Sequence, residues 1–334
     1  MNRISVIVPV YNLEAYVSES IGSILRQTHA DLEVIAVDDG STDGSLAVLR
    51  QLAGTDARLH VLHQENGGVT RARLTGVRAA TGEWIGFMDG DDRIEPEMYE
   101  RLLQNALAYD ADISHCGYQM VFPSHVDYYY NTGRLIEQDN LSGQKDLIEG
   151  RFVEPSLINK LYRRELLEGY LNSDEGNDSV RNYEDLLMNF YLFRRARRSV
   201  YEDICPYHYV LRKGSAATSG VNEYKLRDPL IVARTIREET KTDPVLLHAA
   251  NERLAGALTA LATMALDDQP ELIRRYRTDA RKELRELCPA ILKGQYSAKR
   301  KLITAWAALL PGFYGFAHRF YGRLTGHDRK YEVR

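Results

Sequence analysis

The beginning of the chain alternates apolar runs of strand length with amphipathic stretches. Residues 4–8, 32–37 and 84–88 are nearly continuous apolar runs, as expected for strands that are buried on both faces. Between the first two runs, residues 13–27 place apolar side chains at helical intervals: Val17, Ile21, Ile24 and Leu25. Strands that alternate with helices are typical of a parallel sheet covered by helices on both sides. We therefore expect an α/β fold.

Each of the three apolar runs leads into polar residues. Tyr11 and Asn12 follow the first run, Asp38 and Asp39 the second, and the acidic stretch Asp89–Asp92 the third. In open parallel sheets, ligands bind in the crevice beyond the carboxyl ends of the strands. The three polar segments therefore define a candidate binding site.

The acidic stretch Asp89–Asp92 holds three carboxylates within four residues. Such crowded carboxylates repel one another, which raises their pKa values. A divalent cation bound among them removes that repulsion, and Mg²⁺ or Mn²⁺ suits hard oxygen ligands while gripping the phosphates of a substrate. The alternative is an Asp-Gly turn that only ends the strand.

The loop after the second predicted strand and a Gly-Gly segment that precedes the third carry the remaining polar signals. Asp38 and Asp39 are suited to hydrogen-bonding a nucleobase imide or a ribose hydroxyl, although acids before a helix also act as N-caps. We expect that capping role for Asp43. Gly67–Gly68 opens a helical stretch with exposed N–H groups that favour anions, without the Lys-Ser/Thr pair of a P-loop.

Four segments of the chain together resemble the nucleotide-sugar half of a family 2 glycosyltransferase of GT-A fold. They are Val6–Asn12, Val37–Asp43, Asn66–Arg73 and Phe87–Asp92, in the order and spacing of that family. Leu74 departs from the family pattern, which usually has Asn after Ala-Arg. The similarity continues more loosely through residues 157–164, 182–190 and 207–215, and ends near residue 220.

The resemblance implies a binding site for a nucleotide-sugar donor, with a UDP-sugar as the expected donor. Pro9 and Tyr11 would line the base pocket, and Asp39 would recognise the nucleobase. The complete expected set of donor-binding residues is Pro9, Tyr11, Asn12, Asp38, Asp39, Asn66, Gly68, Arg73, Asp89, Gly90, Asp91, Arg212 and Ser215. Arg212 also fits a solvated surface residue.

The resemblance also implies a metal-dependent inverting transfer. Mn²⁺ or Mg²⁺ would bind at Asp91, Asp92 and His208, although a histidine between aromatic residues also fits a structural role. Asp185, next to Glu184, would act as the general base that accepts the proton of the acceptor hydroxyl. Acids in a first helical turn also stabilise the helix dipole, and both roles are compatible.

The chain length of 334 residues accommodates more than one structural region. We expect a GT-A catalytic domain over residues 1–220, with a donor-binding half at 1–110 and an acceptor-side half at 111–220. A helical region is expected over residues 221–334, with about three helices between 223 and 287, such as 245–266 and 271–287.

The C-terminal residues are basic in a chain of net charge −4. Residues 271–334 contain 15 Lys and Arg against 6 Asp and Glu, which gives +9 and leaves −13 for the remainder. Within them, residues 302–316 are apolar and aromatic, but are too short and interrupted to span a bilayer. An anionic membrane surface is the partner that we predict, with a core helix or a dimer contact as alternatives.

Three scattered cysteines and the lack of a signal-peptide pattern at the start favour the cytoplasm, with the enzyme bound peripherally to the inner face of the membrane. The expected acceptor is a glycan or a polyprenyl-linked glycan of bacterial surface-polysaccharide synthesis. A nucleic-acid partner is not expected, and the sequence does not define the oligomeric state. The alternatives are a nucleotidyltransferase and a catalytically silent relative.

Overall fold

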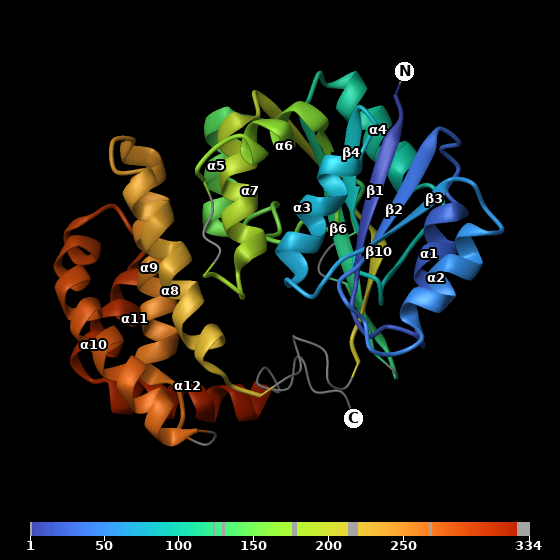
Figure 1. The fold of residues 1–334 in the computed structure, drawn as a ribbon. Helices are drawn as coiled ribbons and strands as arrows, with labels where there is room; N and C mark the ends of the chain where they lie inside the picture. Colours follow the sequence, from blue (N-terminus) through green and yellow to red (C-terminus); the bar gives the residue numbers. More distant parts are fainter. Residues whose placement is uncertain are drawn as a thin grey trace. The chain divides into compact units, whose positions relative to one another are not determined.

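The computed structural model describes residues 2–122, 124–128, 131–175, 179–212, 220–266 and 269–325 (Figure 1). The chain forms two compact units. The N-terminal unit comprises Met1–Gly176 and Met188–Leu211, and the C-terminal unit comprises Asn177–Leu187 and Arg212–Arg334. The division therefore falls inside one helix, α7 (Glu184–Arg195).

The N-terminal unit is built on one mixed β-sheet. Four parallel strands lie in the order β3-β2-β1-β4, and the sheet continues through β9, β6, β10 and β5, while β7 pairs with β6 and β8 with β10. The strands are β1 (Ile4–Val10), β2 (Leu32–Asp38), β3 (Leu59–His63), β4 (Trp84–Phe87), β5 (Arg93–Ile94), β6 (Ile113–Val121), β7 (Val126–Tyr128), β8 (Leu135–Asp139), β9 (Lys160–Arg163) and β10 (Arg198–Val210).

Helices cover both faces of the parallel strands, as Figure 1 shows. One face packs on α1 (Val17–Leu25), α2 (Ser45–Ala53) and α4 (Met98–Ala108), whose apolar side chains form one core with alternate residues of β1 and β2. The other face packs on α3 (Val69–Ala79), where Ala72 contacts Ile35 and Val37. The predicted doubly covered α/β arrangement is confirmed.

The first strand continues beyond the predicted end at residue 8 and includes Pro9 and Val10. Pairing of β1 with β4 stops at Ile7, whereas pairing with β2 continues to Val10. Pro9 lacks an N–H group and is disfavoured in a central strand. Its position is tolerated because β1 is paired on one side only at that point.

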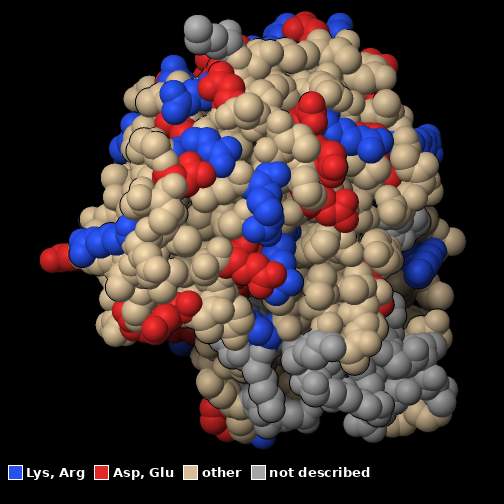
Figure 2. Space-filling view, turned by 90° about the vertical axis from the view of Figure 1, so that its right-hand side faces the viewer, with Lys and Arg blue, Asp and Glu red and all other residues tan. Residues whose placement is uncertain are grey.

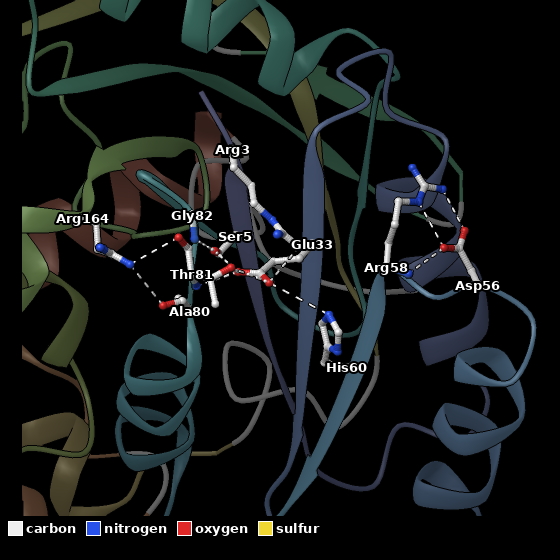
Figure 3. Close-up of polar contacts among 10 residues, drawn as sticks. All are labelled: Arg3, Ser5, Glu33, Asp56, Arg58, His60, Ala80, Thr81, Gly82 and Arg164. Carbon is white, nitrogen blue, oxygen red and sulfur yellow. Dashed lines mark hydrogen bonds and ion pairs between the residues drawn. The ribbon is translucent and has the colours of Figure 1, made fainter. Parts of the chain in front are cut away.

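A buried carboxylate joins the amino ends of β1 and β2 to the loop before β4 (Figure 3). Glu33 accepts hydrogen bonds from the Ser5 hydroxyl at 2.5 Å and from the Thr81 N–H at 2.7 Å, and pairs with Arg3 at 3.2 Å. Burial raises the pKa of Glu33, but the hydrogen bonds from Ser5 and Thr81 more than offset this, so that its pKa lies below the ordinary value. This network fixes the end of the sheet opposite to the candidate site.

Acidic and basic side chains lie next to one another on the face of the molecule shown in Figure 2. Ion pairs of the N-terminal unit have the same character, for example Arg58 with Asp56 at 2.8 Å (Figure 3). Arg58 also donates to the carbonyl of Leu25 at the end of α1, so that this pair ties a loop to a helix.

The C-terminal unit is helical, as predicted. Its apolar core is formed by side chains such as Leu230, Leu258 and Leu284. The helices of this unit are α8 (Glu223–Glu239), α9 (Pro244–Thr263), α10 (Pro270–Lys293), α11 (Ala298–Leu309) and α12 (Pro311–Thr325). Two further helices, α5 (Asn140–Glu149) and α6 (Arg164–Leu171), belong to the N-terminal unit. Within the described ranges, each helix is too short or too polar to cross a membrane.

Candidate active site

The carboxyl ends of β2 and β3 are joined by an aspartate–histidine contact. Asp38 and His63 are opposite one another in the parallel register, and Oδ2 of Asp38 lies 2.7 Å from Nδ1 of His63. The carboxylate of Asp38 is fully buried, and its Oδ1 has no hydrogen-bond partner. An unpaired buried oxygen is costly, and donor binding by Asp38 stays a prediction.

Asp39 organises the Gly-Gly loop at the start of α3. Its Oδ1 accepts from the Gly67 N–H at 2.9 Å and from Nε2 of Gln64 at 2.7 Å, and its Oδ2 accepts from the Gly68 N–H at 2.8 Å. Gly68 has a φ of 88°, which only glycine adopts without strain. Asp39 and the Gly-Gly loop therefore form one rigid assembly, and nucleobase recognition by Asp39 stays a prediction.

The loop after β1 is tied to the loop after β2. The Asn12 N–H donates to the Ser41 hydroxyl at 3.0 Å, and Oδ1 of Asn12 accepts from the Thr42 N–H at 2.8 Å. Tyr11 is 48% exposed beside Asn12, whereas Pro9 is buried in the strand. The role of Pro9 and Tyr11 in a base pocket stays a prediction.

The loop Asp89–Asp92, which we call the acidic loop, packs directly against the end of β1. A Cβ atom at Gly90 would lie 2.9 Å from Leu13 Cδ1 and 3.2 Å from the Pro9 carbonyl oxygen, so that a larger residue would displace the loop. Asp89 in this loop accepts from the guanidinium of Arg73 at 2.9 Å, and the Arg73 side chain is almost fully buried. Arg73, on α3, thus holds the acidic loop beside the Gly-Gly loop.

Asp92 is buried, and both of its carboxylate oxygens accept hydrogen bonds from β10. The Tyr207 hydroxyl donates to Oδ2 at 2.6 Å, and the Val210 N–H donates to Oδ1 at 2.8 Å. Burial raises the pKa of Asp92 well above its ordinary value, and the carboxylates of Asp89 and Asp91 raise it further. Ligation of a metal by Asp92 stays a prediction, and the structure gives this residue a role in attaching β10 to the acidic loop.

The chemistry of the donor set suits a divalent cation at Asp91. In the part of the chain that the structure describes, no group of three or more His, Cys, Asp or Glu side chains lies close enough together to hold a metal ion. Mg²⁺ and Mn²⁺ need only one or two carboxylates, since waters and substrate phosphates complete their shell. Burial is the main cause of the raised pKa of Asp92, and a cation at Asp91 would relieve the smaller contribution from the carboxylates of Asp89 and Asp91.

His208 neighbours this acidic loop through the sheet. It is opposite Arg93 in the antiparallel pairing of β10 with β5, one residue beyond Asp92. Its Nε2 lies 3.2 Å from a carboxylate oxygen of Glu95, and its side chain is 29% exposed. Metal ligation by His208 stays a prediction.

Of the remaining predicted residues, three belong to the C-terminal unit, one to the N-terminal unit, and one lies outside the described residues. Glu184 and Asp185 form the first turn of α7 and are half-buried. Arg212 is half-buried in the same unit, and Asn66, in the N-terminal unit, is exposed. Ser215 lies in the range 213–219, outside the residues that the structure describes.

Tyr207 is a site residue that the sequence alone does not identify. It is fully buried, its hydroxyl donates to Asp92, and its oxygen accepts from the Asp89 N–H at 3.3 Å. Burial and the neighbouring carboxylates of Asp92 and Asp89 raise its pKa, so that it stays a proton donor. Its only signal in the sequence is that it begins the loosely family-like segment 207–215. Its hydrogen-bond partners could not be predicted, because they lie 115 and 118 residues away.

Comparisons with known proteins agree with this architecture. Residues 5–171 match the family described as Glycosyl transferase family 2. An uncharacterised glycosyltransferase of Bacillus subtilis, EpsJ, is 40% identical over 200 residues, which cover 58% of this chain and 57% of EpsJ. The chain thus spans less than two thirds of that relative.

Two solved structures share the fold. Staphylococcus aureus TarS 1–349, in complex with UDP-GlcNAc, aligns with a TM-score of 0.69 at 20% identity over 97% of this chain and 92% of that one. A Pyrobaculum calidifontis mannosyltransferase, PcManGT, in complex with GDP-Man and Mn²⁺, aligns with a TM-score of 0.52 at 20% identity over 93% and 88%. The predicted GT-A fold with a helical C-terminal region is confirmed, and the chain belongs to glycosyl transferase family 2.

Proposed function

We propose that this protein transfers a sugar from a UDP-sugar to a glycan or polyprenyl-linked glycan in bacterial surface-polysaccharide synthesis. The observation that carries the proposal is the assembly at the carboxyl ends of the parallel strands, where Asp39 holds the Gly-Gly loop and Arg73 holds the acidic loop. UDP as the nucleotide is supported by the relative of the same fold that was solved with UDP-GlcNAc.

The reaction is a single displacement that inverts the anomeric centre. The acceptor hydroxyl oxygen attacks the anomeric carbon, the bond from that carbon to the diphosphate oxygen breaks, and the hydroxyl proton passes to a general base. We assign the base to Asp185 and a supporting role to Glu184, in the first turn of α7. Arg212 and Ser215 are assigned to the departing diphosphate.

Mn²⁺ or Mg²⁺ is the proposed cofactor, with Asp91 as its main protein ligand. The ion supplies positive charge that stabilises the diphosphate as a leaving group. Asp89 pairs with Arg73, and Asp92 accepts from Tyr207 and Val210, so these two acids also shape the acidic loop. Asp92 stays a proposed second ligand of the ion. His208 is the candidate for a further ligand.

An anionic membrane surface is the proposed partner of the C-terminal unit. Large apolar residues at intervals of three or four are 42–71% exposed along α11 and α12: Leu302, Trp306, Leu309, Phe313, Phe316 and Phe320. Thr304, Ala307 and Ala308, on the other side of α11, are buried. The exposed basic residue Lys299 precedes the apolar stripe, and the exposed Arg319 lies next to its last residue, which suits a helix lying in an anionic interface. This attachment would hold the enzyme at the inner face of the cell membrane, beside a lipid-linked acceptor.

Thermal unfolding with a panel of nucleotides and nucleotide sugars, each with and without Mn²⁺, tests the donor assignment. A ligand at about 100 times its Kd adds about 2.7 kcal/mol to the free energy of unfolding. We expect stabilisation by UDP and by one UDP-sugar, larger with Mn²⁺. Equal responses to all nucleotides, or no response, would contradict the proposal.

A further inference from the structure

The segment that leads into α7 is held by a buried carboxylate on α8. Oδ2 of Asp228 accepts from the Arg181 N–H at 2.7 Å and from the Asn182 N–H at 3.0 Å, and Oδ1 accepts from Nε of Arg227 at 2.8 Å. The Asp228 side chain is fully buried. A carboxylate in this setting is tolerated because its charge is satisfied by these donors, which makes the attachment of the segment specific.

Between this attachment and the Glu184–Asp185 turn, the backbone of one residue has an unusual conformation. Tyr183 has a φ of 68°, in the left-handed region that residues other than glycine rarely adopt. It directly precedes Glu184, the first residue of α7. Such a conformation persists only where surrounding contacts impose it, and the Asp228 bonds to the two preceding N–H groups supply such contacts.

The following turn of α7 is held in the N-terminal unit. Nδ2 of Asn189 donates to the carbonyl oxygens of Pro155 at 2.7 Å and Ser156 at 3.1 Å. Its Oδ1 accepts from the Tyr162 hydroxyl at 2.6 Å. Asn189 is fully buried and follows Asp185 by four residues, so that both lie on the same side of the helix.

The loop that Asn189 contacts is itself fixed. The ammonium group of Lys160, which is buried, donates to the carbonyl oxygens of Glu154 at 2.8 Å and Ser156 at 2.6 Å. Consecutive carbonyls from residue 154 to 156 are thus all bonded to buried side chains. The Asn189 amide therefore contacts a rigid surface, which sets the rotation of α7 about its axis.

We infer that Asp228 and Asn189 are positioning residues for the Glu184–Asp185 turn. Asp228 fixes the chain as it enters the turn, and Asn189 fixes the helix immediately after it. Neither residue contacts the reacting atoms, and both act through the backbone of α7. The inference rests on the proposed role of Asp185 as general base, and it deepens that proposal by naming what orients the base.

The test compares Asp228→Asn with a matched control, Asp243→Asn. Asp243 also accepts two backbone hydrogen bonds in the C-terminal unit, from Val245 at 2.8 Å and Leu246 at 3.0 Å, but it caps α9. Amide hydrogen exchange reports the local effect, calorimetric UDP titration reports donor-site integrity, and UDP release from the most stabilising UDP-sugar reports kcat. Asn189→Ala is measured in parallel as the independent second variant.

For Asp228→Asn we expect faster exchange within residues 179–187, a UDP affinity within about twofold of the original, and a kcat lower by at least about tenfold. Misplacement of a catalytic group by about 1 Å costs roughly 10²-fold in rate. Asp243→Asn should accelerate exchange near residues 245–246 and leave kcat unchanged. Arg227→Gln removes the bond to Oδ1 and the bond that Arg227 donates to the Ser179 carbonyl oxygen, but it leaves both backbone hydrogen bonds to Oδ2 in place. It serves as the milder variant if Asp228→Asn does not fold.

Two outcomes separate this inference from the proposed function. If Asp185→Asn is inactive while the Asp228 and Asn189 variants loosen residues 179–187 with unchanged kcat, the positioning role is wrong and the base assignment holds. If Asp185→Asn keeps full activity, the base assignment fails and the inference fails with it.

Discussion

The hydroxyl of Tyr207 on β10 donates a hydrogen bond of 2.6 Å to the carboxylate of Asp92, 115 residues earlier in the chain. The same hydroxyl accepts from the Asp89 N–H at 3.3 Å, so one side chain holds both ends of the acidic loop. This relationship links the late strand β10 to the motif that carries the proposed metal ligand. The geometry of the acidic loop therefore depends on a residue that lies outside the family-matched residues 5–171.

Tyr207→Phe should lower both stability and donor affinity. Loss of the hydroxyl leaves a buried carboxylate oxygen without its donor, which costs about 1–3 kcal/mol in the free energy of unfolding. Denaturant unfolding measures this loss, and titration with UDP and Mn²⁺ measures the change in Kd. Tyr99→Phe is the control, since the buried Tyr99 hydroxyl lies 3.4 Å from the Phe87 carbonyl oxygen. Equal UDP affinities in the two variants would contradict the role of Tyr207.

Asp91→Asn should abolish stabilisation by Mn²⁺. The substitution removes the charge of the proposed ligand with little change of shape, and a neutral amide is a much weaker ligand for a hard cation. The melting temperature is measured across a Mn²⁺ titration with saturating UDP. Asp56→Asn, at an ion pair with Arg58, should respond to Mn²⁺ as the original protein does. An undiminished Mn²⁺ response in Asp91→Asn would remove this residue from the metal site.

Glu33→Gln should make stability less dependent on pH in the acidic range. Hydrogen bonds from Ser5 and Thr81 lower the pKa of Glu33 below the ordinary value of 4.5, so the ionised form stabilises the fold. That contribution is complete above about pH 4.5 and is lost as the pH falls through the lowered value. The difference in unfolding free energy between the two proteins, about 1–3 kcal/mol at pH 7, should shrink toward pH 3. A difference that is constant with pH would contradict this account.

Phe313→Ser combined with Phe316→Ser should weaken binding to anionic vesicles. Both side chains are about 60% exposed on α12, and serine at each position removes apolar area that would contact the membrane. Sedimentation with phosphatidylglycerol vesicles measures the bound fraction, and high salt should reduce it further. Leu107→Ser is the matched control, because Leu107 is 48% exposed on α4 of the other unit. Unchanged sedimentation of the double variant would exclude this face as the membrane contact.

The parallel strands β1, β2 and β4 could be predicted because they are nearly continuous apolar runs, whereas β3 was not predicted because His60 and His63 interrupt its apolar pattern. The strand pairs of the other half of the sheet could not be predicted, since β10 contains polar residues such as Glu202, whose buried carboxylate accepts from Asn105 and pairs with Arg101. The pair with Arg101 joins residues 101 positions apart. Periodicity within a short window does not contain such information.

The candidate site, too, could be predicted only in part. The polar ends of β1, β2 and β4 meet as predicted, because carboxyl ends of parallel strands share an edge. The hydrogen bonds from Gly67 and Gly68 to Asp39 were not predictable. The sequence pattern indicates which residues lie near the edge of the sheet, but not which N–H groups donate to a given carboxylate. Tyr207 escaped prediction for the same reason.

Sugar transfer by the original protein and by Asp185→Asn, with UDP affinity measured on the same preparations, tests the central claim most directly. The donor is the UDP-sugar that stabilises the protein most, and the readout is UDP release in the presence of glycan acceptors. We predict that the original protein releases UDP in an acceptor-dependent manner, and that Asp185→Asn binds UDP normally but releases it at least about 10²-fold more slowly, as expected for loss of a general base. Equal rates in the two proteins would contradict the account.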